Sequence, residues 1–463
     1  MNNLIFYDTE TTGIQRDYSQ ILQCGSIQTN RDFHTIEEQN ISCRPLPWVI
    51  PQPGAMLANK KTNLFNSNVS HYQMMLGLNR QWREWTIDDP GIFISFNGHT
   101  FDDELIRRQF YWNLLDVYIT QTQGNGRLDL LTMMHNLAVF FTDAINIPLF
   151  EEGPGISLKL EDLASANGID TAEAHDAMAD CRFMIDLFKL LDQALPEWVD
   201  FYLSTATKQG LKNALNANTY LALGEVYRRE RFSYPVVICG GDISRPNDIV
   251  FFDLSYDPED IFSLEVPDIH KMVQSNSRDG PLKKYKVNKT IPICPAEMLK
   301  DKSVFDMSEQ ELQKRANLVK ENIEFQEHVS TAMADRIFNS IEPSHAEEAI
   351  YSGGFPDKRD KDLMDDFHRI EDESHRIKIA RNIQDDRYRL FAERLICQMY
   401  PESAPKDMMH RFEELLQERL ATEGKWGSMD KTLNELEKLL ANSDAHQKTI
   451  LLETQEFIKN STV

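Results

Sequence analysis

The sequence predicts an α/β domain with a mixed sheet, followed by a small β-containing domain and an all-helical C-terminal domain. Three patterns indicate this order. Strand-like and helix-like segments alternate up to about residue 195, short apolar runs bounded by turn residues follow, and amphipathic helical periodicity continues from about residue 357. The length of 463 residues allows about three domains of ordinary size, which we place at 1–195, 196–350 and 351–463.

Each element follows from local composition and periodicity. In the first domain we expect strands at 4–10, 21–28, 34–43, 92–97 and near 128. We expect its helices at 71–84, 102–113, 130–140, 159–167 and 176–191. In the second, a helical stretch near 197–215 precedes strands at 234–239, 248–254 and 285–293, with further helix at 308–340. A linker at 341–360, with two prolines and two glycines, leads to helices around 366–370, 390–396 and 433–440.

Two carboxylates mark the end of the first predicted strand. Asp8 and Glu10 are separated by one residue, so they point to the same face of the sheet while Thr9 is turned away. Two carboxylates this close repel each other unless a proton or a cation lies between them. Such pairs also occur on solvated strands, so this pair indicates a metal site only if matching groups come from elsewhere in the chain.

Matching groups follow in order along the chain. The predicted strand ending at Asn97 leads to Asp102 at the start of a helix, and His175 precedes Asp180 by five residues. Five residues turn a helix by about 500°, so His175 and Asp180 cannot share one helical face. We therefore expect Asp180 inside a helix and His175 at its N-terminal end or in the segment before it. Carboxylate ligands suit Mg²⁺, which Mn²⁺ can replace.

Together these residues predict a two-metal hydrolytic site. Two ions about 4 Å apart can stabilise both the attacking and the leaving oxygen of a phosphodiester. Asp8 would bridge the ions, while Glu10, Asp102 and Asp180 would complete the coordination. His175 would take the proton of the attacking water, since its unperturbed pKa of about 6.5 suits a general base near neutral pH.

These motifs resemble the DEDDh branch of the ribonuclease H-like 3′→5′ exonucleases, and within it the bacterial exonuclease I family. The likeness extends over 51–55, 101–104, 127–131 and 160–169, and more loosely over 228–231, 294–295 and 351–355. It implies a ribonuclease H-like exonuclease domain, a small SH3-like domain, and processive degradation of single-stranded DNA to 5′-mononucleotides in repair or recombination. It also implies a partner, the acidic C-terminal tail of the single-strand DNA-binding protein.

Two positions in the first motif depart from that family. Thr9 and Thr12 stand where the family leads us to expect bulkier residues. We expect this difference to affect the fit of the terminal nucleotide and not the metal ligands.

Substrate binding must overcome an unfavourable overall charge. The net charge of −24 is the opposite of the basic surface that nucleic-acid-binding proteins usually present, so binding DNA requires local basic groups. The candidate substrate contacts are Glu10, Thr11, Phe101, Arg107, Arg108, Arg127, Lys208 and Lys212. Aromatic side chains that could stack on bases include Phe65, Trp82, Tyr111 and Trp112. The alternative for each basic group is a solvated edge, and for each aromatic group ordinary core packing.

Two other functions remain open. The same site chemistry serves 3′→5′ exoribonucleases and proofreading-type exonucleases, although those chains are commonly much shorter. A non-enzymatic alternative is a single-stranded DNA-binding scaffold that retains the carboxylates without turnover.

The remaining features favour a cytoplasmic protein. No apolar run approaches the roughly 18 residues of a membrane span, so no membrane association and no signal peptide are expected. The six cysteines lie singly, with no Cys-x-x-Cys, as is typical of a reducing compartment. We expect a monomer, because the three domains could enclose a strand without a second copy.

Overall fold

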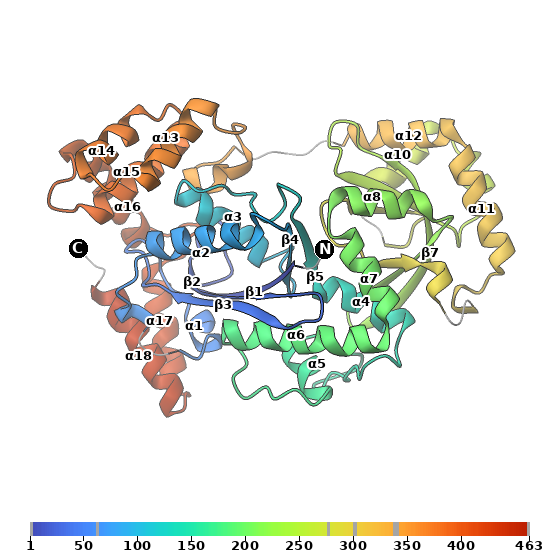
Figure 1. Ribbon diagram of the computed structural model, residues 1–463, viewed down its shortest axis with the longest axis horizontal. Helices are drawn as coiled ribbons and strands as arrows, with labels where there is room; N and C mark the ends of the chain where they lie inside the picture. Colours follow the sequence, from blue (N-terminus) through green and yellow to red (C-terminus); the bar gives the residue numbers. More distant parts are fainter. Residues whose placement is uncertain (1–2, 62–63, 276–277, 300–302, 337–341, 461–463) are drawn as a thin grey trace.

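A five-stranded mixed sheet lies at the centre of the first 195 residues in the computed structural model (Figure 1). Its strands, in the spatial order β3-β2-β1-β4-β5, are β1 (Asn3–Thr11), β2 (Ile21–Thr29), β3 (Thr35–Ser42), β4 (Gly91–Ser95) and β5 (Gly126–Asp129). β1 pairs antiparallel with β2 and parallel with β4, which confirms the predicted mixed sheet. The structure describes residues 3–61, 64–275, 278–299, 303–336 and 342–460.

Helices cover both faces of this sheet (Figure 1). On one face lie α2 (His71–Thr86) and α3 (Asp102–Trp112), and on the other α5 (Leu160–Ala166) and α6 (Ala177–Ala194). The alternation of side chains along β1 explains this arrangement. Tyr7 packs edge-on against Trp82 of α2, whereas Phe6 packs edge-on against Phe188 of α6. The same alternation directs Asp8 toward α6 and Thr9 toward α3.

Three further elements complete this part of the chain, and the last of them is buried in the main core. They are α1 (Pro53–Ala58), η1 (Leu64–Asn66) and α4 (Leu130–Phe140). All strands and helices predicted for residues 1–195 are present, with ends that differ by a few residues.

The middle of the chain forms a second, antiparallel sheet in the order β10-β6-β7-β8-β9. Its strands are β6 (Leu221–Tyr227), β7 (Glu230–Gly241), β8 (Asp248–Asp253), β9 (Leu282–Lys286) and β10 (Ile293–Pro295). The accompanying helices are α7 (Pro196–Thr205), α8 (Lys208–Ala217), α9 (Pro258–Phe262), α10 (Val266–Gln274), η2 (Ala296–Met298), η3 (Ser303–Phe305), α11 (Glu309–Glu321) and α12 (Ile323–Ala334). One hydrophobic core runs across residue 195, because Leu4 and Phe251 belong to the same buried cluster.

Two expectations for this middle part need correction. The strand predicted at 285–293 is two strands, β9 and β10, because the loop between them turns toward the first sheet. In that loop Asn288 accepts a hydrogen bond from Arg127, and the Thr290 hydroxyl lies 3.0 Å from Nε2 of His99. The helix predicted at 308–340 is interrupted at Asn322, which caps α12, and residues 337–340 lie outside the described residues.

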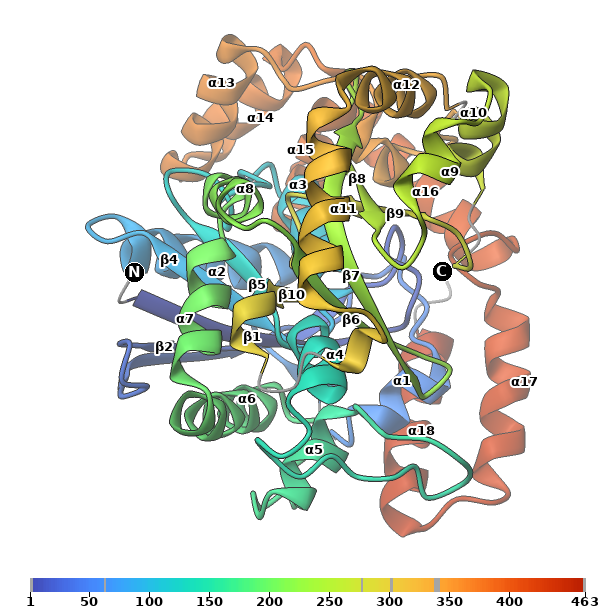
Figure 2. The ribbon, with the colours of Figure 1, turned by 90° about the vertical axis from the view of Figure 1, so that its right-hand side faces the viewer.

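The C-terminal part is helical, as predicted. Its elements are η4 (Ala346–Tyr351), α13 (Lys358–Arg369), α14 (Glu373–Asn382), α15 (Asp386–Met399), α16 (Lys406–Ala421), α17 (Met429–Leu440) and α18 (Ala445–Asn460). In both views α13–α16 lie toward the upper end of the α/β domain and α17–α18 toward the lower end (Figure 1, Figure 2). Trp48 and Phe391 share one core cluster, and Ile50 and Leu436 share another, so both groups of helices pack on the segment that follows β3.

The linker expected at 341–360 is a structured segment; its residue 341 lies outside the described residues. Glu347 of η4 is only 2% exposed and pairs with Arg394 at 2.8 Å and with Arg419 at 3.1 Å. A buried carboxylate needs such partners. The ion pairs therefore anchor the start of the C-terminal helices. Within the described residues, no helix is long and apolar enough to span a membrane.

Candidate metal-dependent active site

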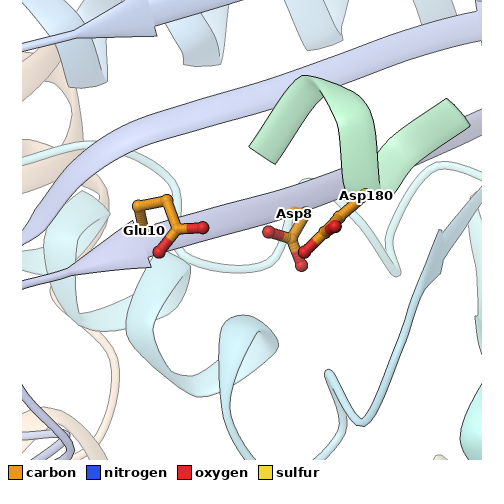
Figure 3. A group of neighbouring side chains, drawn as sticks. All are labelled: Asp8, Glu10 and Asp180. Atoms are coloured by element: carbon orange, nitrogen blue, oxygen red, sulfur yellow. The ribbon is translucent and has the colours of Figure 1, made fainter. Parts of the chain in front are cut away.

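Three carboxylates from two elements meet beside the C-terminal end of β1. One oxygen from each of Asp8, Glu10 and Asp180 lies within 4.8 Å of the others (Figure 3). Asp8 and Glu10 come from β1, and Asp180 comes from the first turn of α6. Glu10 is buried, while Asp8 and Asp180 are partly exposed. The side chains of Asp8 and Glu10 thus share one face of the sheet, as their spacing predicts.

Asp102 approaches β1 from the start of α3, where the side chain of Thr9 contacts it. It is the first residue of α3 and is 4% exposed, and its Oδ1 accepts a hydrogen bond from the Thr9 hydroxyl. The three-carboxylate group does not include Asp102, but the charge of Asp102 acts strongly on Asp8. Thr9, which we expected to affect only the terminal nucleotide, contacts one of the four candidate metal ligands. The reason is the alternation along β1, which turns Thr9 toward the start of α3.

The electrostatics of the four carboxyls favour a cation between them. Burial raises the pKa of Glu10 to about 8, of Asp102 to about 7 and of Asp180 to about 6. Burial, together with the charges of Asp102, Asp180 and Glu10, also raises the pKa of Asp8 well above its usual range. A bound cation favours the ionised carboxylates and so reverses these shifts. All the donors are carboxylate oxygens, a set that fits Mg²⁺ or Mn²⁺.

His175 lies in the turn before α6, outside the helix, as the spacing predicts. Its φ of +68° is left-handed, and its backbone N–H points to Oδ1 of Asp180 at 3.4 Å. Its side chain is 44% exposed, and Nε2 lies 3.5 Å from Oε2 of Glu161 on α5. Burial and the nearby Lys60 lower the pKa of His175. Asp176 then begins α6, because its carboxylate accepts hydrogen bonds from the first N–H groups of the helix.

Glu161 is a site residue that sequence reasoning did not single out. It lies within the 160–169 segment that resembles exonuclease I, but no local pattern distinguishes it from other acids on a short helix. Its contact with His175 depends on how α5 packs beside α6.

The three arginines expected to bind DNA are buried and paired with acids. Each is less than one-tenth exposed. The closest pairs are Arg107–Glu104 at 2.9 Å, Arg108–Asp17 and Arg108–Glu104 at 2.6 Å, and Arg127–Asp103 at 2.6 Å. This corrects the expectation of an exposed basic surface beside Asp102. Charged side chains are seldom this buried without a partner. The pairs Arg108–Asp17 and Arg127–Asp103 also tie α3 to neighbouring elements.

The other candidate substrate contacts differ in exposure. Phe101 is half-buried directly before Asp102, and Thr11 is buried with its hydroxyl donating to the Gly13 carbonyl at 2.9 Å. Lys208 and Lys212 are exposed on α8, where Lys208 donates to Asn247 at 2.6 Å. The tip of the β6–β7 hairpin, residues 228–231, is also exposed. The exposed basic groups among these candidates therefore lie on the middle part of the chain.

The aromatic candidates lie mainly in the interior. Trp82, Tyr111 and Trp112 are buried in the core, where they cannot stack on bases. Phe65 stacks on Phe457 of α18, with 4.9 Å between the ring centroids. Ordinary packing, the alternative left open by the sequence, accounts for all four.

A cavity of about 680 Å³ adjoins the His175 turn. Its lining includes Lys60, Lys61, His175, Asp176 and Arg182. A volume of this size is typical of small-molecule sites.

Comparisons with known proteins find similar sequences and similar folds. Residues 344–461 match the family model described as the Exonuclease I C-terminal domain. Exodeoxyribonuclease I of Buchnera aphidicola subsp. Baizongia pistaciae is 32% identical over 273 residues, 56% of this chain and 55% of that protein. Exodeoxyribonuclease I of Escherichia coli is 26% identical over 372 residues, 77% of each chain. The chain is similar in sequence to bacterial exonuclease I. The sequence match spans about half the length of the Buchnera protein and about three quarters of the Escherichia coli protein.

Solved structures extend the likeness to the whole fold. Exonuclease I from Methylocaldum szegediense matches with a TM-score of 0.82 at 23% identity. Escherichia coli exonuclease I in complex with a dA16 oligonucleotide matches with a TM-score of 0.83 at 20% identity. Both alignments cover 100% of each chain. A zinc-ion-bound form of the Escherichia coli ExoI–ssDNA complex has also been solved, with a TM-score of 0.81. These solved structures show that the chain has the fold of exonuclease I.

Proposed function

We propose that this chain is a 3′→5′ exodeoxyribonuclease that degrades single-stranded DNA processively to 5′-mononucleotides. The observation that carries the proposal is the convergence of Asp8, Glu10 and Asp180, with Asp102 and His175 beside them. These groups come from three separate parts of the chain, and the fold around them matches exonuclease I from end to end. The relatives named exodeoxyribonuclease I support DNA as the substrate class.

The carboxylates would hold two Mg²⁺ ions, which Mn²⁺ could replace. Asp8 would be the ligand shared by both ions, since the charges of Asp102, Asp180 and Glu10 all act on its carboxylate. When bound, such ions neutralise negative charge on the phosphate and lower the pKa of a water molecule.

The histidine would supply the proton transfer. His175 accepts a proton from the attacking water, whose oxygen bonds to the terminal phosphorus. The bond from that phosphorus to the 3′-oxygen of the preceding nucleotide then breaks. The leaving oxygen takes a proton from solvent, which yields a 5′-mononucleotide and a strand one nucleotide shorter. Glu161 orients the imidazole through its contact with Nε2.

Binding of single-stranded DNA would depend on local basic side chains and not on the net charge of the protein. Lys208, Lys212 and the 228–231 hairpin tip offer exposed positive groups that could follow a phosphate backbone. Phe101, next to Asp102, is the candidate contact for the terminal base.

The proposed partner and cellular setting rest on the resemblance to exonuclease I. One solved structure is described as SSB/Exonuclease I in complex with an inhibitor, with a TM-score of 0.80. The acidic C-terminal tail of the single-strand DNA-binding protein is therefore the proposed partner, and DNA repair or recombination in the cytoplasm the proposed setting, with the enzyme acting as a monomer. A labelled tail peptide should bind with an affinity that falls steeply as salt rises.

Matched substrates distinguish this function from its alternatives. Single-stranded DNA, duplex DNA and single-stranded RNA of one sequence would be digested in parallel with Mg²⁺. The proposal expects fast hydrolysis of the single-stranded DNA alone. Equal rates on RNA would favour the exoribonuclease alternative, because RNA differs at the 2′-hydroxyl. Tight DNA binding without metal-dependent hydrolysis would favour the scaffold.

A further inference from the structure

Two adjacent lysines contact the residues on either side of His175. The Lys60 ammonium donates a hydrogen bond to the carbonyl of Ala174 at 3.2 Å. The Lys61 ammonium pairs with Oδ2 of Asp176 at 2.6 Å. Both lysines belong to the short segment that follows α1, more than a hundred residues before His175. One segment therefore holds both ends of the backbone that carries the imidazole.

The conformation of His175 explains why such contacts matter. His175 is a non-glycine residue with a left-handed φ, a strained conformation that persists only where its surroundings fix it. The turn supplies part of this constraint, because Ala174 N–H bonds to Thr171 at 3.0 Å and Asp176 N–H to Glu173 at 3.1 Å. Those bonds lie within the turn, whereas the two lysines connect the turn to the segment after α1, and the Gln23 amide connects it to β2 by donating to Oδ2 of Asp176 at 3.3 Å.

The lysine segment is itself anchored on both sides. The side-chain amide of Asn59, which is buried, donates to the carbonyl of Thr11 at 3.0 Å, next to Glu10 on β1. The carbonyl of Lys60 lies 2.9 Å from Nε2 of His446 on α18. Lys61 also donates to the side chain of Gln23 on β2. The segment thus joins the strand that carries two candidate ligands, the C-terminal helix and the His175 turn.

We infer that Lys60 and Lys61 are positioning residues that hold the His175 turn against the carboxylate group. Lys60 acts through the Ala174 carbonyl, and Lys61 acts through the Asp176 carboxylate. The inference rests on the proposed function, because it assumes that His175 takes a proton during hydrolysis. Loss of either contact should lower kcat and leave KM nearly unchanged, since the lysines act on the base and not on the substrate.

Methionine and arginine substitutions separate this role from direct DNA binding. Lys60→Met and Lys61→Met keep the apolar stem and remove the charge, and each should lower kcat by about tenfold with KM within about twofold. Lys60→Arg and Lys61→Arg keep a donor and should retain most of the activity. Lys438→Met, on an exposed lysine of α17, is the matched control. A rise in KM with unchanged kcat would mean that the lysines bind the strand, and it would overturn the inference.

A double-mutant cycle tests the route through Asp176. Asp176→Asn breaks the ion pair but keeps a residue that caps helices well. The Lys61→Met/Asp176→Asn variant should lose no more activity than either single variant, because both remove the same contact. If the activity loss of the double variant equals the product of the two single losses, the residues act independently and the inference is contradicted.

Hydrogen exchange gives a readout that does not depend on activity. Amides of residues 171–176 should exchange faster in Lys60→Met and Lys61→Met than in the wild type, while the exchange of β1 stays unchanged. If the wild type is active and both lysine variants keep its exchange rates and its kcat, the inference is overturned while the proposed function stands. An inactive wild type would instead refute the proposed function.

Discussion

The backbone amide of His175 points to the carboxylate of Asp180, with 3.4 Å between its nitrogen and Oδ1. The two residues cannot share a helical face, and the left-handed turn at His175 lets the chain fold back toward the first turn of α6. The candidate base and a candidate metal ligand are therefore fixed relative to each other by local backbone. The five-residue spacing in the sequence reflects this turn.

Removing one carboxylate from the cluster should stabilise the metal-free protein. Asp8, Glu10 and Asp180 lie close together and repel, so Asp8→Asn should raise the thermal unfolding midpoint in EDTA. Saturating Mg²⁺ should stabilise the wild type by about 3 kcal/mol at a hundredfold excess over Kd, and the variant by much less. Differential scanning calorimetry measures both, with exposed Asp88→Asn as the control. Equal responses of Asp8→Asn and wild type to Mg²⁺ would contradict a metal site at Asp8.

The Thr9 hydroxyl should matter for activity, although Thr9 is not a candidate ligand. It donates a hydrogen bond to Asp102, so Thr9→Val should reduce both Mg²⁺ affinity and kcat by about 10- to 100-fold. Thr9→Ser keeps the hydroxyl and should stay close to the wild type. Metal titrations of the initial rate provide the measurement. Similar rates for the valine and serine variants would show that the contact has no role in orienting Asp102.

Stability should fall between pH 6.5 and about 4 because of His71. Its ring is 2% exposed, its Nδ1 lies 3.2 Å from the Asn113 amide nitrogen, and burial lowers its pKa from 6.5 to about 4. Below pH 6.5 the unfolded chain binds a proton at His71 that the folded state excludes. The contribution of His71 to the free energy of unfolding is therefore fully present above pH 6.5 and is lost as the pH falls toward 4.

Urea unfolding at pH 7.5 and pH 4.5 measures this effect. Between pH 7.5 and pH 4.5, the free energy of unfolding should fall by roughly 2–3 kcal/mol more in the wild type than in His71→Gln, whose side chain cannot titrate. The exposed His410→Gln variant should behave as the wild type does. Identical pH dependence in all three proteins would contradict the assignment to His71.

Breaking the buried ion cluster at the start of the C-terminal helices should be costly. Glu347→Gln leaves Arg394 and Arg419 buried without a negative partner, so unfolding free energy should fall by about 3–5 kcal/mol. Glu423→Gln removes a largely exposed partner of Lys431 and should change stability by less than about 1 kcal/mol. Denaturant titrations compare the two. A change of less than about 1 kcal/mol in Glu347→Gln would contradict this cost, because it would mean that water or a rearranged side chain replaces the lost partner of the two arginines.

The sequence predicts well what depends on local pattern. The strand that carries Asp8 and Glu10 and the helix that carries Asp180 follow from a short apolar run and from helical periodicity. The capping carboxylate of Asp176 likewise marks the start of α6 and leaves His175 outside it. These features need only neighbouring residues, so their prediction does not require knowledge of tertiary contacts.

Features that depend on distant partners were missed or misread. Arg108 is buried because Asp17 reaches it across ninety-one positions, and no local signal distinguishes it from a DNA-binding arginine. The contact of Thr9 with Asp102 and those of Lys60 and Lys61 with the His175 turn arise in the same way. The apparent strand at 285–293 divides because Thr290 approaches His99 of the first domain.

A single-turnover assay tests the proposed chemistry most directly. Single-stranded DNA labelled at either the 3′ or the 5′ end would be mixed with wild type or Asp8→Ala, in Mg²⁺ or EDTA. The wild type should release labelled mononucleotide from the 3′ end only with Mg²⁺, and Asp8→Ala should be slower by at least about a thousandfold, or about 4 kcal/mol. No release by the wild type, or release that survives Asp8→Ala, would contradict hydrolysis at this carboxylate cluster.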